Sequence, residues 1–262
     1  MAGVNKGVVK GFKNRKIGLA LGGGAVLGAA HIGVLKALKE NDVSIACLAG
    51  TSVGAFVGAF CAFGMEWEEI DKIARDLKWL DVSRVSISQY GLLSNRKLGD
   101  LIIEHVGDVS FDQAKIPLAM VATDITTGEK VVLREGSVAS AVMASSCIPG
   151  IFVPVEMDGR LLVDGGIVEN VPLTPLQEMG ADLIIGVDLN SGRRDERPQN
   201  IVEVLLRSFN FMLASATRLQ TEEADILIQP DLSGFNMYDM DQEGDLFEAG
   251  YLEAMKMLRK VL

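Results

Sequence analysis

Cysteine is scarce in this sequence of 262 residues, which has Cys47, Cys61 and Cys147 and no others. The number is odd and no Cys-x-x-Cys pair occurs, so the sequence indicates neither a disulfide framework nor a zinc site. All three cysteines lie among apolar or small residues. We therefore expect buried free thiols, as in a protein of the reducing cytoplasm.

Basic charge is also limited, because 25 lysines and arginines stand against 35 aspartates and glutamates and leave a formal net charge of −10. A nucleic-acid-binding protein needs a basic face, so we expect no nucleic-acid partner. Residues 1–16 are the exception, with five basic residues and no acidic one. We expect them to form a disordered basic tail; the alternative is a segment that touches an anionic lipid surface.

We expect neither a signal peptide nor a transmembrane helix. The basic start leads into Gly22–Gly24 instead of an apolar stretch with a cleavage site. Residues 43–65 carry no charge and are long enough to cross a bilayer, but the polar pair Thr51-Ser52 lies in their middle between glycines. A buried strand, a tight turn and a buried helix explain this segment better.

Apolar runs of strand length alternate with segments of helical period, which is typical of a parallel α/β sheet. No repeat or linker divides the chain, so we expect one domain over residues 17–262. The expected strands are residues 17–21, 45–49, 117–125, 130–133, 151–157, 160–163, 182–188 and 225–229. The expected helices are residues 28–40, 53–63, 67–77, 95–106, 200–223 and 242–261, with another that begins at the N-cap Ser137. Residues 81–93 are polar and irregular, and we expect a mobile flap there.

The pentapeptide Gly50-Thr51-Ser52-Val53-Gly54 fits the nucleophile-elbow pattern G-x-S-x-G. This chemistry needs a serine on a sharp turn between a strand and a helix, and glycines let the two elements approach each other. The pattern follows an expected strand and opens an expected helix. We therefore predict that Ser52 is a nucleophile and that the Val53 N–H points at a developing oxyanion.

A second glycine-rich segment, Gly22–Gly28, lies between the first expected strand and its helix. A dinucleotide-binding loop is disfavoured because Ala25 breaks the G-x-G-x-x-G spacing and no acidic residue ends the second strand. A Walker loop is excluded because no Lys-Ser/Thr follows. Two interpretations stay open: backbone N–H donors that hold an anion, or close strand–helix packing without chemistry.

Asp164, followed by two glycines at the end of an expected strand, is the candidate base. Its alternative interpretation is an ordinary turn aspartate. The rival carboxylates are Asp124, Asp182 and Asp188.

Histidine is present only as His31 and His105, so a Ser-His-Asp triad would have to use one of them. We expect His31 to pack inside a helix and His105 to be exposed near a helix end, or bonded to its last carbonyls. Neither is in a loop after a strand, where a triad base is usually presented. A serine–aspartate pair therefore fits better.

Four ordered blocks make the sequence resemble the bacterial patatin-like phospholipases: residues 19–38, 49–55, 121–154 and 162–188. The resemblance implies a three-layer α/β/α sandwich with a mainly parallel central sheet, without a metal or cofactor at the catalytic core. It implies that Ser52 is the nucleophile, that Asp164 is its general base, and that the N–H groups around Gly23, Gly24 and Ala25 form the oxyanion hole.

The glycine loop departs from that family in two places. Ala25 replaces a glycine, and Leu27 replaces a basic residue that could steer an anionic headgroup. We expect residue 27 to lie near a bound phosphate, so that Leu27→Arg would favour anionic phospholipids; the competing expectation is that Leu27 packs into an apolar seam.

The resulting prediction is a cytoplasmic esterase, lysophospholipase or phospholipase A, acting on a lipid or lysolipid ester through an acyl-enzyme. Peripheral contact with the inner membrane face is compatible with the basic tail, and the oligomeric state stays open, a homodimer being one option. The alternatives are a non-hydrolytic lipid-binding or regulatory protein of the same fold and an acyltransferase.

Overall fold

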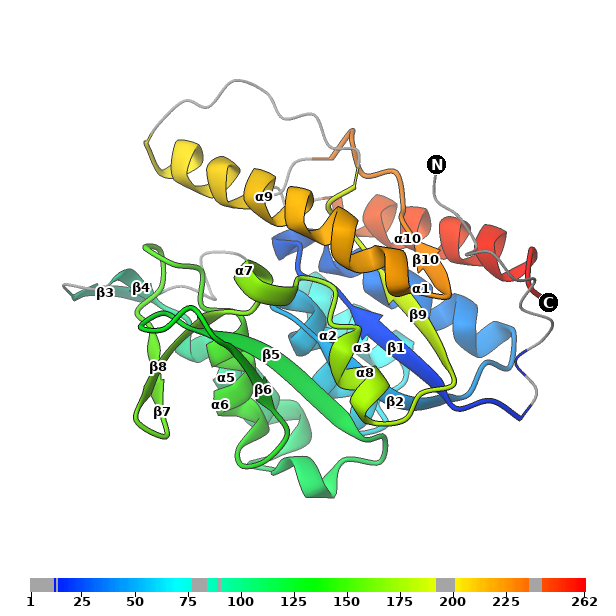
Figure 1. Ribbon diagram of the computed structural model, residues 1–262, viewed down its shortest axis with the longest axis horizontal. Helices are drawn as coiled ribbons and strands as arrows, with labels where there is room; N and C mark the ends of the chain where they lie inside the picture. The colour runs from blue at the N-terminus through cyan, green and yellow to red at the C-terminus, as the bar shows by residue number, and fades with distance from the viewer. Residues whose placement is uncertain (1–11, 13, 77–83, 89–90, 192–200, 236–241) are drawn as a thin grey trace.

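The computed structural model describes residues 12, 14–76, 84–88, 91–191, 201–235 and 242–262 (Figure 1). Most of the expected basic tail, and residues 81–83 and 89–90 of the expected flap, lie outside these residues.

The central sheet has eight strands in the order β10-β9-β1-β2-β5-β8-β7, with β6 paired to β5. Its parallel part is buried and apolar, because helices cover both faces. The parallel strands are β1 (Ile17–Leu21), β2 (Ile45–Gly50), β5 (Leu118–Asp124), β9 (Leu183–Val187) and β10 (Ile226–Ile228). The antiparallel strands are β6 (Lys130–Leu133), β7 (Val155–Met157) and β8 (Arg160–Asp164).

One edge of β5 is shared by two strands that run toward each other. Met120 pairs with Gly50 of β2 and Ala122 pairs with Asp164 of β8, while β6 occupies the opposite edge at both positions. Because β8 is antiparallel to β5 and β2 is parallel, the carboxyl ends of β2 and β8 meet. The topology thus brings the residues after Gly50 to Asp164.

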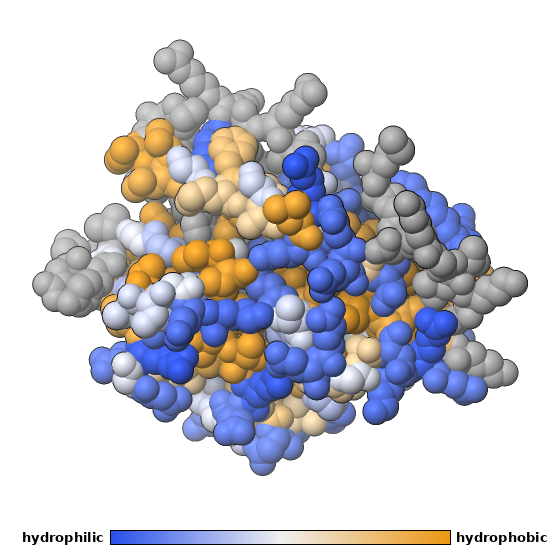
Figure 2. Space-filling model, in the orientation of Figure 1, coloured by the Kyte–Doolittle hydropathy of each residue, from blue (hydrophilic) through white to orange (hydrophobic). Residues whose placement is uncertain are grey.

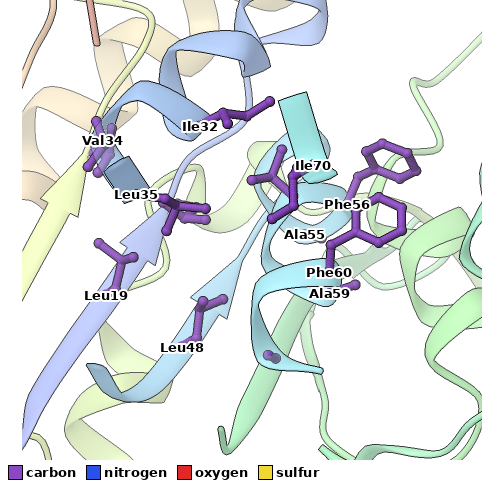
Figure 3. Close-up of a cluster of buried hydrophobic side chains, with 14 of the residues drawn as sticks. Leu19, Ile32, Val34, Leu35, Leu48, Ala55, Phe56, Ala59, Phe60 and Ile70 are labelled. Atoms are coloured by element: carbon purple, nitrogen blue, oxygen red, sulfur yellow. The ribbon is translucent and has the colours of Figure 1, made fainter. Parts of the chain in front are cut away.

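Helices lie on both sides of the sheet, which confirms the three-layer α/β/α sandwich (Figure 1). The larger core joins one sheet face to most of the helices, and Figure 3 shows part of it between β1, β2 and helices α1, α2 and α3. A smaller core under α8 covers the other face. The helices are α1 (Ala29–Glu40), α2 (Val53–Ala62), α3 (Trp67–Asp76), α5 (Arg96–Val106), α6 (Val138–Ser145), α7 (Gly166–Glu169), α8 (Thr174–Glu178), α9 (Ile201–Gln220) and α10 (Glu243–Leu258).

The first and last helices, α1 and α10, cross at glycines. A Cβ atom on Gly33 would lie 2.0 Å from the Phe247 carbonyl oxygen, and one on Gly250 would lie 2.0 Å from the Ala30 oxygen. Only glycine permits this approach of the two backbones. The Lys36 ammonium also lies over the Tyr251 ring, 4.6 Å from its centroid.

Most expected elements are confirmed within a few residues, with three corrections. The segment expected to be irregular contains an antiparallel pair, β3 (Arg84–Ser88) and β4 (Gly91–Ser94); alternating apolar residues at Val85 and Ile87 were the overlooked signal. The short helices α7 and α8 were not expected. Cys61 is half-buried, whereas Cys47 and Cys147 are buried, and all three are free.

Among the described residues, no helix has the length and apolar character needed to span a membrane. Within the same residues, no group of three or more His, Cys, Asp or Glu side chains is arranged to hold a metal ion.

Candidate functional site

Ser52 occupies a strained turn between β2 and α2, with φ 55° and ψ −125°. Side chains fix the turn on both sides. The Ser52 N–H donates to Ser145 Oγ (3.0 Å), whose hydroxyl donates to the Val121 carbonyl (2.7 Å). The Thr51 hydroxyl donates to the Glu169 carbonyl (3.0 Å). A left-handed backbone is unfavourable for serine, so these bonds maintain a conformation that local propensity opposes.

Glycines create the room for this turn. A Cβ on Gly54 would lie 2.0 Å from the Leu21 carbonyl oxygen, and one on Gly50 would lie 2.5 Å from the Gly54 oxygen. Both contacts are with backbone atoms, which side-chain rotation cannot relieve. The two glycines of the G-x-S-x-G pattern therefore allow β1, β2 and α2 to meet at Ser52.

Asp164 lies at the end of β8, is buried, and interacts with the Ser52 side chain, which favours the ionised form of its carboxyl. The Gly166 N–H donates to Asp164 Oδ1 (2.8 Å). Burial raises the pKa of Asp164 to about 6, while the bonds from Gly166 and Ser52 partly oppose the rise. The group is therefore largely ionised at neutral pH and is a stronger base than an exposed aspartate.

The rival carboxylates have other partners. Asp124 Oδ1 accepts from the Thr126 N–H (2.9 Å), and Asp182 Oδ2 accepts from the Lys16 N–H (2.8 Å). Asp188 accepts from the Asn190 N–H (2.9 Å) and from Gln229 Nε2 (3.0 Å). The structure thus brings Ser52 together with Asp164.

The glycine loop lies beside the serine, since a Cβ on Gly23 would be 3.2 Å from the Ser52 Cβ. The Gly23 N–H is directed at Asn170, with 3.2 Å to Oδ1 and 3.3 Å to the carbonyl oxygen. In the described part of the chain, no protein acceptor bonds the N–H groups of Gly24, Ala25 or Val53. Of the four donors expected from the sequence, these three remain available to an oxyanion, and Gly23 anchors the loop instead.

Three side chains hold the loop in place. His31 Nε2 donates to the Gly22 carbonyl (2.7 Å), Asn190 Nδ2 donates to the Gly23 carbonyl (2.7 Å), and Asn170 accepts from Gly23 as described. The roles of Asn170, Asn190 and Ser145 were missed from the sequence. For Asn170 and Asn190, the sequence gives one indication of these roles, because each follows shortly after a buried strand whose end lies at the site.

The two histidines lie as expected. His31 is completely buried in α1, and burial lowers its pKa to about 4, so it is neutral at pH 7. His105 is exposed near the end of α5, with its ring 6.2 Å from that of Phe60. His31 is thus a neutral donor to the loop.

Ala25 has φ 50°, in the left-handed region that favours glycine. Leu27 is completely buried in the larger core. The expectation that residue 27 lies beside a headgroup is therefore wrong, and its competitor holds, because the leucine packs under the loop. An arginine there would place a charge in the core.

An apolar pocket with a cavity volume of about 130 Å³ begins at Ser52. Helices α1, α2, α3 and α10 contribute Ile32, Phe56, Ile70 and Leu246, and Phe152 follows from the loop beyond α6. Its apolar lining suits an alkyl chain. The site therefore joins the Ser52 hydroxyl, the buried Asp164 carboxylate, backbone donors and an apolar pocket.

The sequence matches the family described as Patatin-like phospholipase over residues 19–176. An uncharacterized NTE family protein of Mycobacterium tuberculosis is 40% identical over 206 residues, which are 76% of this chain and 57% of that protein. Neuropathy target esterase sws of Drosophila melanogaster is 34% identical over 183 residues, 67% of this chain and 13% of that protein. The chain thus spans little more than half the length of the mycobacterial relative.

Among solved structures, VipD from Legionella pneumophila matches with a TM-score of 0.56 and 16% identity. The match covers 94% of this chain and 67% of that one. At this identity the likeness concerns the fold alone.

Proposed function

Because the chain belongs to the patatin-like phospholipase family, we propose that it hydrolyses acyl esters of lipids, as a lysophospholipase, phospholipase A or esterase, with Ser52 as nucleophile and Asp164 as general base. The observation that supports this most directly is the interaction of Ser52 with the buried Asp164 carboxylate, at the end of an apolar pocket.

In the first half of the reaction, Ser52 Oγ attacks the ester carbonyl carbon while its proton passes to Asp164. The negative oxygen of the tetrahedral intermediate accepts hydrogen bonds from the N–H groups of Gly24, Ala25 and Val53, and the N-terminus of α2 adds a favourable dipole. Collapse of the intermediate breaks the ester bond. The alcohol leaves with the proton from Asp164, and the acyl group stays on Ser52.

In the second half, a water molecule gives a proton to Asp164 and attacks the acyl-serine carbonyl. The fatty acid is released and the proton returns to Ser52. The raised pKa of Asp164 suits both halves, because the carboxylate must accept a proton and then return it near neutral pH. The three free cysteines support a reducing, cytoplasmic location.

The test is labelling with a fluorophosphonate, followed by turnover of short esters, lysophospholipids and diacyl phospholipids. Ser146 supplies a matched control, since it lines the same pocket and its buried hydroxyl has no partner among the described residues. We expect parent and Ser146→Ala to label and Ser52→Ala not to label. Asp164→Asn should lose on the order of 10⁴ in kcat with its fold intact.

Each alternative gives a different result in this assay. A folded parent that binds lipid without labelling would be a binding protein and would refute the proposal. Labelling followed by transfer of the acyl group to an added alcohol, in preference to water, would identify an acyltransferase.

A further inference from the structure

Helix α9 presents an apolar stripe to solvent. Its apolar members have exposed fractions between 42% and 69%, and hydrophobic residues gather along this helix in Figure 2. At about 100° per residue, the stripe occupies about 120° of the helix surface, and its two polar members are small and neutral. The stripe consists of Ile201, Val204, Leu205, Ser208, Phe211, Met212, Ser215 and Leu219.

The opposite side of α9 fixes the helix to the protein. Leu213 and Thr217 are buried, and Gln220 Nε2 donates to the Val168 carbonyl of α7 (2.7 Å). A Cβ on Gly166 would lie 3.1 Å from Leu213 Cδ1. The apolar stripe is thus the outer face of an anchored helix and needs a partner of its own.

The anchor of α9 is next to the site. Helix α7 begins at Gly166, whose N–H binds the Asp164 carboxylate, and Leu213 of α9 lies against this same glycine. Ile167 of α7, 38% exposed, adds another apolar group. A surface that covered the stripe would therefore be separated by the thickness of α9 from Gly166, which binds Asp164.

The charge of the protein distinguishes between the surfaces that could cover the stripe. No stripe residue is charged, whereas the whole chain has a formal net charge of −10. A second copy or an anionic membrane would bring like charge against the protein. A phosphatidylcholine layer has no net charge, and its hydrocarbon accepts leucine, phenylalanine and methionine side chains. The exposed Arg218 borders the stripe, where it can meet lipid phosphates.

We propose that α9 docks in the plane of a zwitterionic lipid layer through this stripe and thereby brings the Ser52–Asp164 site to its substrate. The substrate class rests on the proposed function, but the docking is measured without catalysis.

The experiment compares sedimentation with phosphatidylcholine vesicles for full-length Ser52→Ala and for the same protein with Phe211→Ser and Met212→Ser. Removing two large apolar contacts should weaken partitioning by at least about tenfold. The matched control is Leu252→Ser on α10, which is 56% exposed and outside the stripe, and it should partition like its parent. With Ser52 present, Phe211→Ser/Met212→Ser should hydrolyse a soluble short ester at the parental rate.

Equal partitioning of the stripe variant and its parent would overturn the proposal. So would a parent that is dimeric by analytical ultracentrifugation and becomes monomeric in the stripe variant without binding vesicles. Binding that requires phosphatidylglycerol would also contradict it. If vesicles bind as expected but no ester is turned over, the docking stands and the proposed hydrolase function fails.

Discussion

The candidate site contains two strained turns that are held in different ways. Ser52 and Ala25 both follow a strand and precede a helix, with φ 55° and 50°. The other described non-glycine residues with positive φ are Asn14, Asp42 and Asp158, types that tolerate this backbone. Ser52 and Ala25 are therefore the two positions where the backbone conformation opposes the residue type.

The turn at Ser52 is enclosed by backbone, because Gly50 and Gly54 leave no space for a Cβ. The loop at Ala25 is held by side-chain hydrogen bonds at Gly22 and Gly23: His31 donates to the Gly22 carbonyl, Asn190 donates to the Gly23 carbonyl, and Asn170 accepts from the Gly23 N–H. One added carbon atom is therefore enough to disrupt the turn at Ser52, whereas the hydrogen bonds of the loop at Ala25 can be removed one at a time. The strain also differs in use, since it places Ser52 at the apolar pocket and next to Asp164 but has no evident use for the Ala25 methyl.

The largest effect is expected from breaking the enclosed turn with Gly54→Ala. The new methyl would meet the Leu21 backbone at 2.0 Å, so β1 or α2 must move. We expect a loss of at least about 3 kcal/mol in unfolding free energy and no measurable turnover. Denaturant unfolding measures the first quantity. Gly244→Ala, where the nearest atom is the Arg75 side chain at 3.9 Å, serves as the control; because Gly244 lies in α10, it should be as stable as the parent or up to about 1 kcal/mol more stable.

A smaller effect is expected from loosening the glycine loop at His31. His31→Leu removes the donor to the Gly22 carbonyl, and the displaced N–H groups should lower kcat by roughly 10- to 100-fold. His31→Gln keeps a donor and should retain most of the rate of single-turnover acylation. If both variants lost as much as Ser52→Ala, a histidine triad would replace the serine–aspartate pair.

The raised pKa of the buried Asp164 predicts that both activity and stability depend on pH. No such dependence is expected from the glycine loop. Protonation of Asp164 should make kcat/KM fall about tenfold per pH unit below an apparent pKa of about 6. The free energy of unfolding should change in the opposite direction, because the raised pKa of Asp164 lowers stability as the pH rises. A folded pKa of about 6 against the ordinary 3.8 means that ionisation is penalised in the folded protein, increasingly from pH 4 to pH 6 and fully above it.

Asp164→Asn removes this penalty. The melting temperature of the variant minus that of the parent should therefore grow between pH 4 and pH 6 and then level off. A difference that is independent of pH would show that the Asp164 pKa is not raised.

The smallest effect is expected at Ala25, the second of the two strained positions. Ala25→Gly should relieve the left-handed strain, for a net gain of at most about 1 kcal/mol after the added flexibility of the unfolded chain. Because the N–H stays in place, kcat should change less than about threefold. A loss of stability measured by denaturant unfolding would mean that the alanine methyl packs favourably despite its φ.

Local patterns in the sequence predicted most strands and helices in the right order, apart from β3, β4, α7 and α8, and they predicted the turn around Ser52. They made Asp164 one candidate base among several aspartates, and the family resemblance chose it. Its approach to Ser52 depends on β2 and β8 sharing one edge of β5, which no local pattern encodes. The anchoring of Gly23 by Asn170 has the same origin, since 147 residues separate them. The sequence allows two alternatives for Leu27, because the short segment Ala25–Gly28 has no periodicity from which to choose its buried side.

The close crossing of α1 and α10 has a consequence for the order in which the molecule is completed. During synthesis, α1, the glycine loop and Ser52 leave the ribosome more than 180 residues before Leu246, which supplies a wall of the apolar pocket. Until α10 arrives, the face of α1 around Gly33 has no partner and the chamber stays open to water. Pairing of such distant segments slows folding and leaves apolar surface exposed meanwhile. The nascent chain therefore passes through an aggregation-sensitive interval that ends only when its last described helix docks.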